Sequence, residues 1–201
     1  MISRRQFVAT LGTTLLALPA SAQSRIGVIR DISGDVTLNG FAASPQSALQ
    51  AGHTIATGAD GQVRFTVGND AFFLRPDSRM RLDTSRPGEA FIDFLRLLTG
   101  ALGSTFERGM RRTIVTPTST IGIRGTGVYL EAAPDWTYAC TCFGTTEVSS
   151  SIHERFEVMA QHHEARLIRR GVPIARAAME RHTDEEMAAL EALVGRRHPF
   201  S

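Results

Sequence analysis

The sequence predicts an all-β protein (a sandwich, roll or solenoid) that ends in one α-helix. Three observations lead to this prediction. Short segments of alternating apolar and polar residues, separated by turn residues, run from Arg25 to about Ser150. The 201 residues include 18 glycines and only 7% aromatics, which favours many turns and short strands. After Ser150 the pattern changes, and the last segment has helical periodicity.

The first predicted strands are residues 26–29 and 35–38, and the Asn39-Gly40 dipeptide after them is typical of a tight hairpin turn. Residues 63–67 alternate between apolar and polar side chains, as in a half-buried strand. Residues 91–98 fit a strand or a helix. The glycines that follow at 100 and 103 favour a strand.

The predicted helix covers about residues 184–194, within a C-terminal extension of residues 151–201. Thr183 and Glu186 have the spacing of a capping box at its start, and Gly195 is suited to end it. Met187 and Leu190 belong to one apolar stripe. We therefore expect this helix to pack on the β domain.

Residues 1–22 predict a secretory signal peptide. A charged start is followed by a short apolar run and by a small-residue end at Ala20 and Ala22, which predicts cleavage before Gln23. Arg4-Arg5 fits the twin-arginine pattern, with an ordinary Sec signal as the alternative. The sequence therefore predicts an exported, periplasmic protein that does not span the membrane after cleavage.

Without Arg4 and Arg5, the predicted mature chain has 20 arginines and 20 acidic residues. A formal charge of zero argues against a nucleic-acid partner, because such proteins need a basic face.

Several motifs in order resemble the FecR domain family. They are Gly34-Asp35-Val36, Asn39-Gly40, residues 49–58 with their Leu-x-x-Gly-x-x-Ile-x-Thr-Gly pattern, Leu74-x-Pro76-x-Ser78, and the segment 116–126 with Gly-Ile-Arg-Gly-Thr. The resemblance covers about residues 26–150. It implies a twisted antiparallel β-solenoid or sandwich, with the predicted helix packed on it.

Regulators of the FecR family carry a cytoplasmic anti-sigma segment, a membrane helix and a periplasmic domain that receives a signal from an outer-membrane transporter. This chain resembles a free-standing exported form, because neither the anti-sigma part nor a transmembrane helix is recognisable in it. The resemblance therefore implies an envelope location and an envelope protein as partner, more than a particular activity.

No catalytic motif is recognisable, so we expect a protein that is not an enzyme. The glycine-rich segment 122–127 is not followed by a helix, which argues against a phosphate-binding loop. We interpret it as a tight bend. Arg124, with Gly125 and Thr126 beside it, either pairs internally or binds a partner.

Cys140 and Cys142 are the most distinctive pair in the chain. On a strand, residues two apart point to the same face, and a disulfide between them would be strained. Two thiolates on one face form half of a tetrahedral site for zinc, copper or iron. We predict that at least one of His162, His163 and His182 completes a metal site with them. A reactive dithiol, an intermolecular disulfide and simple burial are the alternatives.

The sequence thus favours a non-enzymatic envelope module for protein interaction or sensing. A periplasmic metal- or redox-active protein that uses the cysteine pair is the alternative. Carbohydrate or peptidoglycan binding is a weaker one, because Trp136 is the only tryptophan available as a stacking platform.

Overall fold

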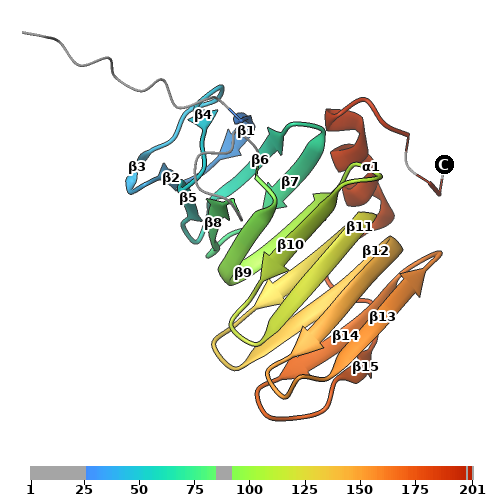
Figure 1. Ribbon diagram of the computed structural model, residues 1–201. Helices are drawn as coiled ribbons and strands as arrows, with labels where there is room; N and C mark the ends of the chain where they lie inside the picture. Colours follow the sequence, from blue (N-terminus) through green and yellow to red (C-terminus); the bar gives the residue numbers. More distant parts are fainter. Residues whose placement is uncertain (1–25, 85–91, 198, 201) are drawn as a thin grey trace, which may run out of the picture.

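Figure 1 shows the computed structural model, which describes residues 26–84, 92–197 and 199–200. The predicted signal peptide lies outside these residues. The N-terminal half of the sheet contains β1 (Gly27–Ser33), β2 (Val36–Leu38), β3 (Phe41–Ala42), β4 (Ala48–Leu49), β5 (Thr54–Thr57), β6 (Gln62–Val67), β7 (Asp70–Leu74) and β8 (Arg79–Asp83). The C-terminal half contains β9 (Phe94–Thr105), β10 (Arg111–Val115), β11 (Ser119–Ala132), β12 (Trp136–Ser150), β13 (Arg155–Ala160), β14 (Glu164–Arg169) and β15 (Ala175–Ala177), followed by the helix α1 (Asp184–Leu193).

All fifteen described strands belong to one sheet, whose main order is β15-β14-β12-β11-β10-β9-β7-β6-β1-β4. The strand pairs are antiparallel except for β9 and β10, which run parallel. The sheet twists from the short N-terminal strands to β15 without closing into a barrel (Figure 1). The prediction of an all-β fold with a C-terminal helix is confirmed.

The strands form where the alternating pattern predicted them. Residues 36–38 and 41–42 make a hairpin through Asn39 and Gly40, whose φ angles of 53° and 83° suit the tight turn expected of this dipeptide. In the ambiguous segment 91–98, residues 94–98 belong to the strand β9, and residue 91 lies outside the described residues. The three strands β13 to β15 lie in the segment treated as a C-terminal extension, and they continue the same sheet.

The strand pairing is interrupted at one level across β11, β12 and the junction between β13 and β14. The β11–β12 register shifts between Arg124 and Gly127, opposite Gly144 of β12. On the other edge of β12, β13 and β14 run in the same direction and are separated only by residues 161–163. Gly125, Gly144 and His163 have φ angles of 64°, 86° and 48° at this level. These left-handed residues interrupt the ladder, as bulges do.

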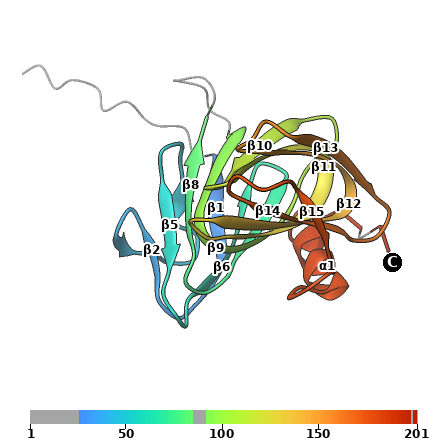
Figure 2. The same cartoon turned by 90° about the horizontal axis from the view of Figure 1, so that it is seen from below.

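The helix α1 lies against one face of the sheet, beside β7 and β9 (Figures 1 and 2). The predicted capping box is present: the Glu186 N–H donates to the Thr183 hydroxyl, and the Thr183 N–H donates to the Glu186 carboxylate. Met187 and Leu190 are buried over Gly103, whose missing side chain leaves room for them. Docking of the helix on the sheet is therefore as expected.

Two buried clusters stabilise the fold. The larger one is formed by strand residues such as Phe65, Phe72 and Leu102. The smaller one lies between α1 and the sheet, and its members are Ala71, Phe73, Tyr129, Tyr138, Cys140, Cys142, Ala165, Met187 and Leu190. No helix in the described part of the chain has the length and apolar character that a membrane crossing requires.

Candidate metal centre

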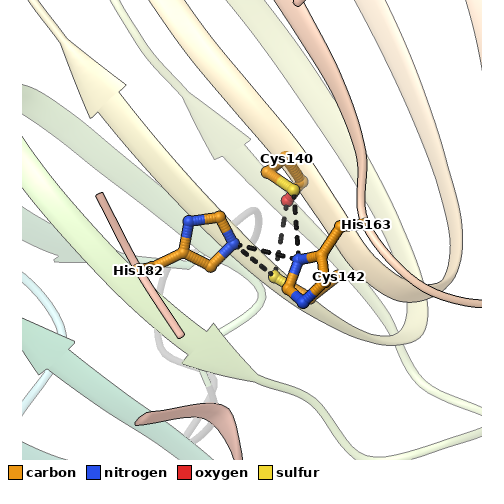
Figure 3. A group of neighbouring side chains, drawn as sticks. All are labelled: Cys140, Cys142, His163 and His182. Atoms are coloured by element: carbon orange, nitrogen blue, oxygen red, sulfur yellow. Dashed lines mark hydrogen bonds between the residues drawn. The ribbon is translucent and has the colours of Figure 1, made fainter. Parts of the chain in front are cut away.

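The centre is built on one face of β12. Its residues alternate, so Trp136, Tyr138, Cys140 and Cys142 share a face, while Thr141 points to the other face and contacts Thr146. Both cysteines are buried and both are free thiols. The predicted orientation of the two sulfurs toward one side of the strand is what the structure shows (Figure 3).

His163 reaches the cysteines from the neighbouring edge of the sheet. It stands in the short break between β13 and β14, where its left-handed backbone turns the chain. Its N–H donates to the carbonyl of Cys142 at 2.9 Å, which fixes the turn against β12. Its side chain is only 3% exposed, and Nδ1 lies 3.5 Å from the Cys140 sulfur.

His182 comes from the segment between β15 and α1, directly before the helix cap. The chain crosses β12 here, because the Tyr138 hydroxyl donates to the carbonyl of Ala178 and accepts from the N–H of Glu180. The imidazole of His182 stacks on Tyr129, with ring centres 4.4 Å apart. Its Nε2 lies 3.4 Å from the Cys142 sulfur.

These four side chains place two sulfurs and two nitrogens within 4.8 Å of one another (Figure 3). Zinc–ligand bonds of about 2.0 to 2.3 Å at tetrahedral angles require sulfur–nitrogen distances of about 3.6 Å and a nitrogen–nitrogen distance of about 3.3 Å. Two of the four sulfur–nitrogen distances, Cys140 to His163 and Cys142 to His182, are 3.5 and 3.4 Å. The distance from His163 Nδ1 to His182 Nε2 is 3.1 Å. The set thus has nearly the dimensions of a tetrahedral site.

The outer partners of the two histidines direct a lone pair of each ring into this set. His182 Nδ1 lies 2.7 Å from the carbonyl oxygen of Glu180, which can only accept, so Nδ1 carries the proton. His163 Nε2 lies 2.7 Å from a carboxylate oxygen of Asp184 and donates to it. In the neutral rings, Nδ1 of His163 and Nε2 of His182 are then unprotonated, and these two atoms face each other.

The two thiols differ in acidity. The hydrogen bond from the Cys142 thiol lowers the pKa of Cys140 to about 5, and the imidazoles of His182 and His163 act in the same direction against the effect of burial. Burial raises the pKa of Cys142 well above its usual value, and the neighbouring Cys140 sulfur adds to this. Without a metal ion, Cys140 is therefore the thiolate of the pair and Cys142 the thiol.

The structure brings His163 and His182 to the cysteines but not His162. His162 is largely exposed, and its Nε2 contacts Asp184 at 3.0 Å. It forms a second group with His163 and Asp184 that contains no sulfur and shares only His163 with the first group. Metal binding by these residues remains a prediction.

The second predicted site, Arg124 with Gly125 and Thr126, lies at the break in β11. Arg124 is exposed and stands directly opposite Arg111 of β10, on a shallow polar hollow of about 220 Å³. Gly125 has no room for a side chain, because a Cβ would lie 2.7 Å from the Cα of Arg108. Thr126 is buried, and its hydroxyl has no hydrogen-bond partner among the residues that the structure describes. The bend is thus present, and the binding role of these residues remains a prediction.

Sequence reasoning missed Asp184, Tyr129 and the carbonyl of Glu180. Asp184 had a visible signal, because it directly follows the cap, but an acid in the first turn of a helix is already explained by the helix dipole. Tyr129 and the carbonyl of Glu180 had none. Their contacts with His182 depend on long-range pairing between strands that the sequence does not reveal.

No protein-family model matches the sequence, and no curated protein matches it. Two solved structures of a candidate anti-sigma factor from Parabacteroides distasonis have a similar fold. One is 14% identical, with a TM-score of 0.53 over 69% of this chain and 64% of that one. The other is 13% identical, with a TM-score of 0.53 over 63% and 60%. The chain thus spans less than two thirds of those chains, and the likeness establishes the fold alone.

Proposed function

We propose that this protein is a non-enzymatic, zinc-binding β module in which Cys140, Cys142, His163 and His182 hold one metal ion. The main support for this proposal is that two imidazole lone pairs and two sulfurs converge at nearly tetrahedral spacing. Two thiolates and two imidazoles at these distances suit zinc better than copper or iron.

The surroundings of the four side chains support a structural ion rather than a catalytic one. Four protein ligands complete a tetrahedral zinc ion and leave no position for a reacting water molecule. Each histidine also has a second partner, a carboxylate or a backbone carbonyl, which is the usual outer arrangement of zinc-binding histidines. The four donor residues are largely buried, which suits an ion that is held permanently.

A bound ion would join three segments that are separate in sequence. Cys140 and Cys142 belong to β12, His163 to the break before β14, and His182 to the segment that leads into α1. Metal binding would thereby fix the C-terminal helix to the sheet.

We further propose that the module acts in the bacterial envelope, in protein interaction or sensing. This rests on the motifs resembling the FecR family and on the predicted signal peptide. The fold shared with a candidate anti-sigma factor is compatible with it.

Elemental analysis of protein purified from its native periplasm tests the metal proposal. We expect about one zinc ion per chain, and loss of that zinc in Cys140→Ser and Cys142→Ser. Thr141→Ser is the matched control, because its side chain points to the opposite face of the same strand. A folded wild-type protein that contains no metal, and takes up none from a zinc buffer, would contradict the proposal.

A further inference from the structure

A hollow of about 230 Å³ opens on the same sheet face as the two cysteines. We call it the Trp136 groove. Trp136 and Tyr138 line it from β12, and Leu167 and Arg169 line it from β14. The outer wall is formed by Ala177 and by the segment that leads to His182. Because residues of β12 alternate, the groove continues the row of side chains that ends in Cys140 and Cys142.

The floor of the groove is aromatic and apolar. The indole of Trp136 is half-buried, and among the described residues it has neither a stacking ring nor a hydrogen-bond partner. Leu167 adds an aliphatic surface beside it. Tyr138 contributes its ring only, because its hydroxyl is already bonded to Ala178 and Glu180. An aromatic floor with one free indole N–H is typical of a small-ligand site.

The lining carries two carboxylates and two guanidinium groups, and both carboxylates lie against the same guanidinium, that of Arg181. Glu131 accepts from Arg181 at 2.6 Å, and Glu180 lies 4.0 Å from the same guanidinium. Arg169, by contrast, is exposed, and its side chain has no ion pair or hydrogen bond within the described ranges. It stands directly opposite Trp136 in the β12–β14 pairing. A guanidinium beside an aromatic floor is suited to bind a carboxylate through two hydrogen bonds.

We propose that the Trp136 groove binds a small carboxylate that carries an apolar or aromatic group. The apolar group lies on Trp136 and Leu167, and the carboxylate pairs with Arg169. The hollow is smaller than the roughly 300–1,000 Å³ of pockets for drug-sized ligands, so it takes a single side chain or ring. This site uses none of the four proposed metal ligands, and it stands independently of the zinc.

Trp136 is the only tryptophan in the chain, so its fluorescence reports directly on this groove. The probe is N-acetyl-phenylalanine, and N-acetyl-phenylalaninamide is the same molecule without the charge. We expect a saturable change in emission with the acid. We expect the amide to bind about tenfold or more weakly, which is the loss expected for one charge-assisted hydrogen bond.

Arg169→Gln should weaken binding of the acid to the level of the amide. Arg176→Gln, which removes an exposed arginine of β15 outside the lining, should leave it unchanged. Calorimetric titration measures the same affinities, so binding that leaves the fluorescence unchanged is still detected. The inference is overturned if the acid does not bind, if acid and amide bind equally, or if Arg169→Gln binds the acid like the wild type. Binding of N-acetylglucosamine in place of the acid would also overturn it.

Discussion

Asp184 offers the sharpest test of the metal centre, because it contacts a proposed ligand without being one. Its carboxylate accepts from Nε2 of His163 at 2.7 Å and also contacts His162. The hydrogen bond fixes the tautomer that exposes Nδ1 of His163, and it makes this nitrogen a better donor to a metal. The pKa of Asp184 is lowered by these histidine contacts, so the carboxylate is charged at neutral pH.

Asp184→Asn keeps the size of the side chain and removes its charge. Loss of such an outer partner typically costs 10- to 100-fold in metal affinity, or about 1.4 to 2.7 kcal/mol. We expect a reduction of this size, with the stoichiometry still at one ion. The four proposed ligands are unchanged in this variant, so the ion is bound more weakly but not lost.

The assay is a competition titration for zinc against a chromophoric chelator of known affinity. Glu185→Gln is the matched control, because it removes the same charge from the same helical turn and Glu185 contacts no histidine among the described residues. Any contribution of the helix dipole affects both variants alike. Equal zinc affinities in the two variants would refute the role assigned to Asp184.

Three further predictions concern stability and are measured by urea unfolding. Leu190→Asp places a charge in the buried interface of α1 and should destabilise the protein by several kcal/mol, whereas Ala189→Asp on the exposed side should change stability little; equal unfolding midpoints would show that the helix does not dock. Arg112→Gln breaks a 2.7 Å buried ion pair with Asp70 and should cost about 3–5 kcal/mol, so a change below 1 kcal/mol would contradict that burial. Gly61→Ala should be strongly destabilising, since a Cβ there would lie 1.9 Å from the carbonyl oxygen of Asp35; wild-type stability would rule out this close approach.

One prediction concerns residues outside the described part of the chain and is measured by cell fractionation. Replacing Arg4 and Arg5 with lysines should block export if the signal is of the twin-arginine type. Unchanged export would favour the Sec alternative.

Much of the fold could be predicted from local patterns, because strand alternation and helix caps depend on residues close in sequence. The orientation of Cys140 and Cys142 follows from parity on a strand, and the helix start follows from Thr183 and Glu186. The choice between His162 and His163 could not be predicted in this way. It depends on the left-handed backbone of His163 and on the hydrogen bond from its N–H to the carbonyl of Cys142 in β12. Only the folded sheet brings these two residues together.

The sequence also did not predict that the interruptions in β11, in β12 and between β13 and β14 lie at one level of the sheet. Gly125 and Gly144 are ordinary turn residues when taken singly. Their common level appears only when the strands are placed side by side. The proposed metal ligand His163 belongs to this level, so the interruption of the strand pairing and the geometry of the site have a common origin.

The position of His182 directly before the helix cap has a consequence for the order in which the molecule opens. His182, Thr183 and Asp184 are consecutive, so one peptide segment carries a proposed ligand, the cap and the outer partner of His163. These contacts can hardly be lost one at a time. The C-terminal segment from Ala178 to Leu193 should therefore behave as a single cooperative unit in hydrogen exchange, with its amides opening together. Chelation of the ion should accelerate exchange across that whole unit while the amides of β6 and β7 keep their protection.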